Sequence, residues 1–320
     1  MVDKNDLEVV KMKKVLVIGS AVVDVVIHLP HLPEKSEDVH VTSQKMSLGG
    51  CAYNASDTIR HFKVPYIPFF PVGPGAYGDF VRNALAERGI VSPVPKPETE
   101  NGCCYCFVED DGERTFACYH GAEYRFQKEW FDALDASEID SVYICGLEIE
   151  EETGTNILSY LEEHPEFTVF FAPGPRITLL DPKRLERVFA LHPILHLNQQ
   201  EITSYTGKEE LKAAAEEIHR FTQNTVIVTL GADGCYYYDG EKEETIPGVP
   251  AEQLDTIGAG DSHIGAVIAG LQCGKTIEEA IATANRVSAK VVETEGALLS
   301  DEAFASLDLL LTGICPEAAV

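Results

Sequence analysis

The chain has 320 residues, of which 45% are hydrophobic and 24% charged, an ordinary composition for a globular protein with an ample core. It carries 52 acidic and 25 basic residues, and the resulting net charge of −27 disfavours nucleic acid and anionic membranes as partners, because both bind basic patches. A nucleotide remains compatible with this charge, because helix N-termini and one cation can hold its phosphates.

Short apolar runs alternate with helix-like segments along most of the chain. The runs predicted as strands cover residues 14–20, 66–72, 141–147, 167–173, 194–198 and 225–231. The helical patterns include residues 51–62, 77–90, 261–274 and 276–293. This alternation predicts an α/β fold with a mostly parallel sheet covered on both faces, whose ligands bind beyond the carboxyl ends of the strands.

Two segments, at about residues 22–48 and 102–121, break this alternation and carry no helical pattern. The second is typical of a hairpin that turns at Asp110, Asp111 and Gly112. We interpret both as a small β-sheet that projects from the core as a lid, and an exposed edge of it could pair with a second copy in a homodimer. Because no repeat or flexible linker divides the chain, residues 1–320 are predicted to form a single domain.

Nine cysteines occur in the sequence, three of them in the run CCYC at residues 103–106. Their odd number, and a polar start over residues 1–13 without a signal-peptide pattern, favour a cytoplasmic protein with reduced thiols. The apolar runs are too short to span a membrane. A metal site at CCYC is disfavoured, because adjacent cysteines on a strand face opposite sides and no second Cys/His pair lies at zinc-finger spacing.

The stretch DTIGAGD, residues 255–261, directly precedes an apolar helical pattern. Gly258 and Gly260 permit a tight turn, and the helix N-terminus brings unpaired N–H groups that can hold an anion. Asp261 would then stand beside a bound phosphate, where a carboxylate is unsuited to binding but suited to removing a proton from an attacking hydroxyl. The alternative interpretation is an ordinary cap on a glycine-rich turn.

Four further features lie at predicted strand ends or at the start of the helix that follows. They are Asp24 in GSAVVD, Gly49, Gly50 and Asn54 in GGCAYN, Asn198 and Glu201 in NQQE, and Thr229, Gly231 and Gly234 in TLGADG. Each has a plain structural explanation on its own, such as a surface carboxylate, a helix cap or a turn. Their joint occurrence on one α/β pattern favours a ligand site.

With GG…N at residues 49–54 and DTIGAGD at 255–261, the sequence resembles the ribokinase-like (PfkB) carbohydrate kinase family from about residue 14 to residue 300. The second motif is highly specific at this position, and the first moderately so. The resemblance implies a three-layer α/β core with a β-sheet lid, and ATP-dependent phosphorylation of a sugar-like alcohol.

The resemblance also implies roles for individual residues. Asp261 is the expected catalytic base, and the turn at Gly258, Ala259 and Gly260 is the expected anion hole. Residues expected on the acceptor are Asp24, Gly49, Gly50 and Asn54. Residues expected on ATP are Asn198 and Glu201 in the Mg²⁺–phosphate network, Thr229, Gly231 and Gly234 along the nucleotide, and Asn285 beside the adenine. In cation-activated members, a monovalent ion such as K⁺ is expected near Asp255 and the segment that contains Ser300.

Two positions depart from the family pattern. Cys51 stands where ribokinases have lysine after the glycine pair, which makes ribose itself a less expected acceptor. His263 stands where many members have phenylalanine, so the local shape beside Asp261 should differ. In the lid, we predict that Arg114 and Tyr119 lie on the inward face.

The acceptor is predicted to be an unphosphorylated sugar, because the Asp24 carboxylate would repel a phosphate and few basic residues lie nearby. Between residues 20 and 60 they are Lys35, Lys45 and Arg60, with Arg114 in the lid. The alternatives are a nucleoside kinase, a sugar-phosphate kinase and an inactive nucleotide-binding module. A dinucleotide-dependent oxidoreductase is disfavoured, because the first strand is followed by Gly19 without the G-x-G-x-x-G pattern. The sequence does not identify the acceptor.

Overall fold

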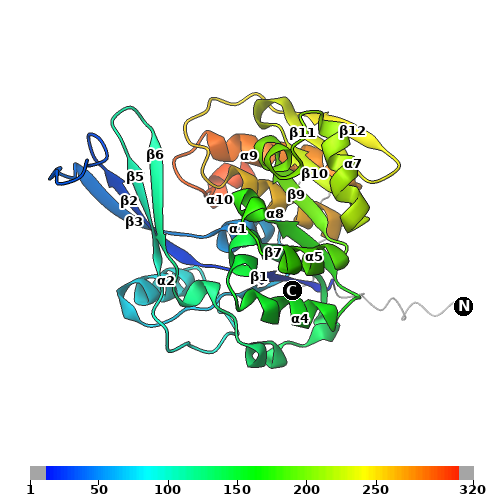
Figure 1. The fold of residues 1–320 in the computed structure, drawn as a ribbon, viewed down its shortest axis with the longest axis horizontal. Helices are drawn as coiled ribbons and strands as arrows, with labels where there is room; N and C mark the ends of the chain where they lie inside the picture. The colour runs from blue at the N-terminus through cyan, green and yellow to red at the C-terminus, as the bar shows by residue number, and fades with distance from the viewer. Residues whose placement is uncertain (1–11, 310–320) are drawn as a thin grey trace, which may run out of the picture.

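The computed structural model describes residues 12–309, which form a large helix-covered sheet and a smaller sheet that projects from it (Figure 1). The large sheet has the strand order β12-β11-β10-β9-β8-β7-β1-β4. Its strands are β1 (Lys14–Ile18), β4 (Tyr66–Phe69), β7 (Ile139–Cys145), β8 (Thr168–Ala172), β9 (Ile194–Asn198), β10 (Val226–Thr229), β11 (Gly234–Tyr238) and β12 (Glu243–Pro247). All neighbours from β10 to β4 are parallel, which confirms the predicted fold class.

Strand β1 illustrates why these segments read as continuous apolar runs. Val15 and Val17 pack into the core on one face of the sheet, and Leu16 and Ile18 into the core on the other. The helices α1 (Cys51–His61), α2 (Gly75–Glu87), α8 (Ala259–Gln272) and α9 (Ile277–Val292) contribute to the first core. The helices α4 (Gly154–Glu162), α5 (Pro182–Ala190) and α7 (Leu211–Thr222) contribute to the second. Both faces are therefore buried, as a parallel sheet requires.

The hairpin of β11 and β12 at one edge of the sheet was not among the predicted strands. Both strands are antiparallel to their neighbours. On β11, Cys235 and Tyr237 pack into one core and Tyr236 into the other. On β12, only Ile246 is buried, and the two glutamates at the start of the strand disguise it in the sequence. A charged edge strand of this kind protects the sheet from pairing with other chains.

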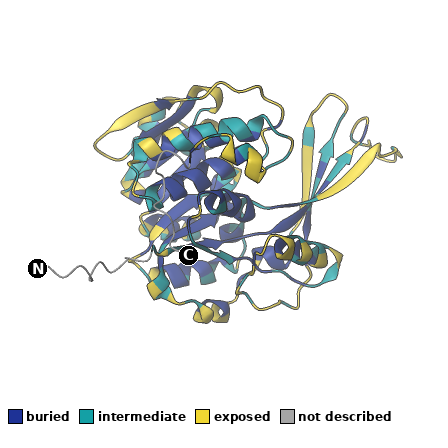
Figure 2. Ribbon diagram, turned by 180° about the vertical axis from the view of Figure 1, so that it is seen from behind, coloured by how far each residue is buried: buried dark blue, intermediate teal, exposed yellow. Residues whose placement is uncertain are grey.

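The small sheet has the order β3-β2-β5-β6 and is built from β2 (Val22–His28), β3 (Ser43–Gly49), β5 (Cys103–Val108) and β6 (Arg114–Tyr119). These strands come from the two segments predicted as the lid, and the hairpin turns at Gly112, whose φ is 89°. The sheet extends away from the core, and much of its outer part is exposed (Figures 1 and 2). The interpretation of residues 1–320 as a single domain includes ends that lie outside the described residues, and it stays a prediction.

Helices α1 and α8 cross in close contact, and this contact positions the site. Gly265 on α8 makes the approach possible, because a Cβ there would lie 2.5 Å from the backbone oxygen of Ala55 on α1. The first turns of the two helices consequently meet at the base of the lid. These turns contain the GG…N and DTIGAGD motifs, which are about 200 residues apart in the sequence.

Candidate active site

A cavity of about 1310 Å³ lies between the lid and the core. Its core side includes the first turn of α1 and the segment that leads into α8. The lining residues from these two segments are Gly50, Cys51, Asn54, Asp255, Ile257 and Asp261. Residues of the DTIGAGD motif and of the GG…N motif therefore line one cavity.

Strand register determines which lid side chains face this cavity. Asp24 pairs with Ser47 and with Cys104, and Cys104 pairs with Cys118, so the four residues form one row across the sheet. Residues in one row share a face, and every second residue along a strand returns to it. The lining residues of three strands follow this alternation: Asp24, Val26 and His28 on β2, Cys104, Cys106 and Val108 on β5, and Arg114, Phe116 and Cys118 on β6. On the edge strand β3, the consecutive residues 43–48 all line the cavity.

The glycine pair before α1 is required by close contacts. A Cβ on Gly49 would lie 1.9 Å from Oδ2 of Asp24, so the absence of a side chain makes room for that carboxylate. Gly50 has a φ of 106°, which glycine adopts readily, and a Cβ there would lie 2.5 Å from the backbone oxygen of Ser20. The pair thus holds the start of α1 against both Asp24 and the end of β1.

Asp261 lies in the first turn of α8, where its Oδ2 accepts a hydrogen bond of 2.9 Å from Nδ2 of Asn54. Burial raises the pKa of Asp261 to about 6, although hydrogen bonds from Asn54 and Cys51 act in the opposite direction. The other amide atom of Asn54, Oδ1, is buried and has no partner among the described residues. The site therefore combines a carboxylate of raised basicity with a free acceptor atom beside it.

The turn before Asp261 is open on the side of the helix terminus. Gly258 is the N-cap of α8 with a φ of 76°, and no side chain caps the helix. A Cβ on Gly260 would have no atom within 4 Å, so free space lies beside Gly260, whereas a Cβ on Gly258 would lie 2.5 Å from Cβ of Ala297. Ala259 begins the helix between the two glycines. An uncapped helix N-terminus that faces free space is suited to an anion.

Asp24 is half-buried on β2 and faces the same cavity. Burial raises the pKa of Asp24 to about 7, and the negative charges of Cys118 and Asp261 raise it further. Asp24 therefore lies close enough to Asp261 for the charge of Asp261 to affect its pKa.

The residues expected on ATP lie at the carboxyl ends of β9 and β10. Asn198 and Glu201 form a capping box at the start of α6 (Gln199–Thr206). The backbone N–H of Glu201 donates to the Asn198 side chain at 2.8 Å, and the backbone N–H of Asn198 donates to the Glu201 side chain at 2.9 Å. Thr229 pairs with Asn198 in the sheet. Burial raises the pKa of Glu201, and the charge of Asp261 adds to the effect, so Glu201 lies within the field of the site. The helix cap that the sequence allowed is present, and a role in binding phosphates stays a prediction.

The rest of the expected ATP residues surround the β10–β11 turn. Gly231 has a φ of 61°, and Gly234 has a φ of 104° with no room for a Cβ, which would lie 2.1 Å from the backbone oxygen of Ile246. The Asn285 amide donates to the backbone oxygens of Ile246 and Pro247 and accepts from the His263 ring. These bonds occupy the amide, so a contact with adenine would have to come from neighbouring atoms.

The model of the pfkB family of carbohydrate kinases matches residues 12–303. The chain belongs to this family. It is 32% identical over 293 residues to the sugar kinase YegV of Escherichia coli, covering 90% of this chain and 91% of that one. It is 27% identical to the ribokinase of Bacillus subtilis, and the alignment covers 89% of this chain and 95% of that one. The fold also matches the crystal structure of Cryptococcus neoformans ribokinase in complex with ADP, with a TM-score of 0.76, 23% identity and coverage of 92% and 99%. The protein is thus a sugar or nucleoside kinase of the ribokinase type.

Arg114 links the lid of this family member to its core. Its Nη1 donates a hydrogen bond of 2.7 Å to Oδ1 of Asp255. The Asp255 side chain is buried, and it also accepts hydrogen bonds from the backbone N–H of Ile257 at Oδ1 and of Gly296 at Oδ2. Burial acts to raise the pKa of Asp255, but the bonds from Arg114 and the backbone outweigh it and hold the pKa below its usual value. The first aspartate of the DTIGAGD motif therefore receives its counter-charge from the lid.

We expect Arg114→Met, which keeps the length of the side chain but removes its charge, to raise the acceptor KM about tenfold, because the lid loses a charged hydrogen bond to Asp255. The ATP KM should change little. A double-mutant cycle with Asp255→Asn is the check: the two effects should overlap rather than add. Additive effects would show that Arg114 acts through a different contact.

Several predicted site residues do not line the cavity, among them the residues expected on ATP, Tyr119 and Ser300. Tyr119 pairs with Cys103, in the row next to that of Cys118, so it points to the opposite face of the lid and is 62% exposed. We therefore correct its predicted place on the inward face. Ser300 accepts a hydrogen bond from the backbone N–H of Ala303 and caps α10 (Asp301–Ala305). A monovalent cation near Asp255 and Ser300 stays a prediction.

Sequence reasoning missed Glu148, which is fully buried in α3 (Gly146–Glu150), directly after β7. Its Oε1 accepts a hydrogen bond of 2.8 Å from the backbone N–H of Ser20, at the end of β1, and its Oε2 has no partner among the described residues. Burial raises the pKa of Glu148 to about 7. A carboxylate just after a buried strand was the signal that could have revealed it.

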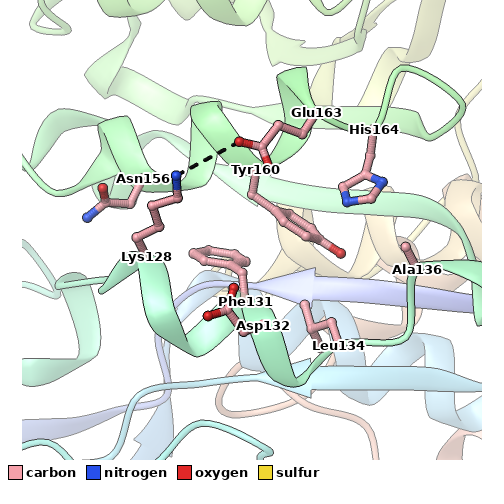
Figure 3. A pocket seen from close by; sticks show the side chains of 9 residues that line it. All are labelled: Lys128, Phe131, Asp132, Leu134, Ala136, Asn156, Tyr160, Glu163 and His164. Carbon is pink, nitrogen blue, oxygen red and sulfur yellow. Dashed lines mark ion pairs between the residues drawn. The ribbon is translucent and has the colours of Figure 1, made fainter.

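A second cavity, of about 220 Å³, lies between α4 and the 3₁₀-helix η2 (Lys128–Ala133) and contains none of the predicted site residues (Figure 3). Phe131 and Tyr160 line it, and Lys128 and Glu163 form an ion pair of 4.0 Å at its rim. Within residues 12–309, no cluster of three or more His, Cys, Asp or Glu side chains could hold a metal ion. None of the helices described is long and apolar enough to cross a membrane.

Proposed function

We propose that the protein transfers the γ-phosphoryl group of ATP to a hydroxyl of an unphosphorylated sugar, with Asp261 as the general base. The observation that carries this proposal is the meeting of Asp24, Asn54 and Asp261 in one cavity at the open N-terminus of α8. The family supplies the reaction class, and the geometry supports the assignment of the roles.

The acceptor sugar would be held by Asp24 and Asn54. An ionised carboxylate accepts hydrogen bonds from two hydroxyls, and the free Oδ1 of Asn54 accepts from a third. Asn54 also donates to Asp261, so one side chain orients both the sugar and the base. This arrangement brings one sugar hydroxyl to the Asp261 carboxylate.

Asp261 would remove the proton of that hydroxyl as its oxygen attacks the γ-phosphorus of ATP. A carboxylate with a pKa of about 6 is largely ionised at neutral pH, yet it is more basic than an exposed aspartate. Negative charge spreads over the phosphoryl oxygens during the transfer, and the N–H groups of the first turn of α8 point toward it. The ADP complex of the Cryptococcus ribokinase supports a nucleotide site in this fold.

The residues present fit a Mg²⁺ ion that is held mainly by phosphate oxygens and water, as is usual for nucleotide-bound Mg²⁺. Glu201 offers one half-buried carboxylate, and Asn198 lies beside it in the capping box. When bound, Mg²⁺ neutralises charge on the phosphates. The protein would contribute this carboxylate and the order of the capping box.

We expect activity to disappear in excess EDTA and to return when Mg²⁺ is added, because ATP without its cation leaves the phosphate charge uncompensated. Coupled ADP release measures this directly. Full turnover in EDTA would contradict the role given to Glu201. In the same assay, K⁺ compared with a bulky organic cation tests the predicted monovalent site.

The charges in the cavity support an acceptor without a phosphate group. Among the described lining residues, the acidic ones are Asp24, Glu87, Asp255, Asp261 and Glu295, and the basic ones are Lys45, Arg88 and Arg114. Arg114 is paired with Asp255, and Arg88 donates to the backbone oxygen of Ala84. The acidic lining residues outnumber the basic ones five to three, so the formal charge of the lining is negative, which disfavours a sugar phosphate.

An ADP-release screen over neutral sugars, nucleosides and sugar phosphates tests the proposal. A neutral sugar should give the highest kcat/KM. A nucleoside as the best acceptor would replace the proposed substrate class, and a sugar phosphate as the best acceptor would contradict the argument from charge. A homodimer through the free edge of β3 or β6 stays a prediction, which sedimentation of the same protein would test.

We expect kcat/KM for the acceptor to fall as the pH drops below about 7, and to fall more steeply below about 6. Asp24 and Asp261 have raised pKa values of about 7 and about 6, and both must be ionised, so activity is present above these values and lost below them. Asp24→Asn should remove the upper step and keep the lower one. A flat profile from pH 5 to pH 8 would contradict both assignments.

A further inference from the structure

Two cysteines of the lid face one another across the β5–β6 hairpin. Cys104 and Cys118 are direct partners in the antiparallel register, and their Sγ atoms lie 3.3 Å apart. Cys104 is half-buried and Cys118 is exposed, so a small oxidant can reach the pair. Both thiols line the cavity, in the same row as Asp24.

The position of the pair within the ladder suits a covalent bridge. The backbone N–H of Glu109 donates to the oxygen of Glu113, and bonded and non-bonded pairs alternate along an antiparallel ladder. Cys104 and Cys118 lie five residue pairs along the ladder from the hydrogen-bonded pair Glu109–Glu113, and therefore form a non-hydrogen-bonded pair. The Cα atoms of such a pair lie about 4.5 Å apart, which is within the range that disulfides span.

The surroundings of the pair favour a reactive thiolate. The hydrogen bond with Cys104 lowers the pKa of Cys118 to about 6 against the opposing effect of burial, and the charges of His120 and Arg176 lower it further. The same hydrogen bond raises the pKa of Cys104, so one sulfur is a thiolate while the other keeps its proton. A thiolate beside a protonated thiol can attack an oxidant and then be resolved by its neighbour.

We propose that Cys104 and Cys118 are a reversible redox site that closes to a disulfide when the protein meets a hydroperoxide. The Cys118 thiolate attacks the terminal peroxide oxygen and the O–O bond breaks, so that Cys118 becomes a sulfenic acid and the leaving alkoxide takes a proton from solvent to become an alcohol. Cys104 then attacks this sulfur, the S–S bond forms, and the hydroxyl leaves as water with the thiol proton. Two thiols thus lose two electrons to one peroxide, which becomes one alcohol and one water.

The bridge would change the acceptor side of the cavity. Cys104 is the register partner of Asp24, and its thiol proton is lost when the disulfide forms. The oxidised pair therefore offers no hydrogen-bond donor beside the acceptor-binding carboxylate, and the acceptor KM should rise about fivefold with the ATP KM unchanged. This consequence rests on the proposed function, whereas the disulfide itself does not.

The test treats the full-length protein with hydrogen peroxide, alkylates the remaining thiols and maps the peptides by mass spectrometry. We expect a linked peptide that joins Cys104 to Cys118, is 2 Da lighter than the sum of its parts and disappears after reduction. Cys106→Ser is the matched control, because Cys106 lines the same cavity but pairs with Phe116, and this variant should still form the bridge. Cys104→Ser and Cys118→Ser should not.

Overoxidised or alkylated Cys104 and Cys118 in the wild-type protein, without a linked peptide, would overturn the redox site. This readout needs neither a variant nor a known acceptor, so it stands apart from any failure of the proposed function. Once an acceptor is identified, an unchanged acceptor KM in fully bridged protein would overturn the link to the active site. Reversal of the raised KM by a thiol reductant would support it.

Discussion

Asp261→Asn is expected to lower kcat by about 10²- to 10⁴-fold while ATP binding is retained. The amide has nearly the same shape and can still accept the hydrogen bond from Asn54, so the cavity should keep its geometry. It cannot accept the proton of the attacking hydroxyl, which is the one property that the proposed mechanism needs. Measuring kcat together with nucleotide affinity distinguishes a loss of catalysis from a loss of ATP binding.

The matched control is Asp79→Asn, which makes the same chemical change on the exposed side of α2, where Asp79 forms a 3.9 Å ion pair with Arg82. It should leave kcat and the acceptor KM unchanged. Near-normal kcat in Asp261→Asn would remove this carboxylate from the role of base. A loss of ATP affinity equal to the loss of kcat would instead assign Asp261 to nucleotide binding.

Asp24→Ala is expected to raise the acceptor KM roughly 10- to 150-fold and to leave the ATP KM nearly unchanged. The loss corresponds to a hydrogen bond between a sugar hydroxyl and a charged partner, which contributes about 1.5–3 kcal/mol. Asp24→Asn should lie between the wild type and the alanine variant, because the amide keeps one acceptor oxygen. Initial-rate measurements with either substrate varied give both constants.

This prediction has its own control on the same strand. Val25 pairs with Tyr105, in the row next to that of Asp24, so its side chain lies on the opposite face of the lid. Val25→Ala should affect the stability of the lid more than the acceptor KM. If Asp24→Ala raised the two KM values equally, Asp24 would be acting on lid closure as a whole rather than on the acceptor.

The sequence was sufficient for the main features of the fold. The parallel strands are apolar at nearly every position because both of their faces are buried, and β9 has the bounds predicted from its apolar run. The hairpin of β11 and β12 was missed because its outer strand, EETIP, lies at an edge of the sheet and has a single buried residue, Ile246. Edge strands lack the continuous apolar signal on which the prediction depended.

Side-chain direction in the lid was harder to predict. The sequence identified the strand RTFACY, but the facing side of a strand depends on its register, and one residue of slip reverses every side chain. Arg114 and Tyr119 are separated by an odd number of positions, so a regular strand cannot point both inward. This alternation, applied to the sequence, would have excluded one of the two residues from the inward face. If Arg114 points inward, the residue near the end of the strand that also points inward is Cys118 and not Tyr119.

The contact between Asn54 and Asp261 joins residues that are 207 positions apart in the chain. The proposed base and its orienting amide therefore cannot meet until the ribosome has released the segment through α8. Strand β1 likewise pairs with β7, and this pairing cannot form until β7 has been synthesised. Contacts of such long range slow folding, because the intervening chain has to be ordered first. A chain truncated before α8 would keep every described strand of both sheets but lack Asp261, and we expect it to show no activity.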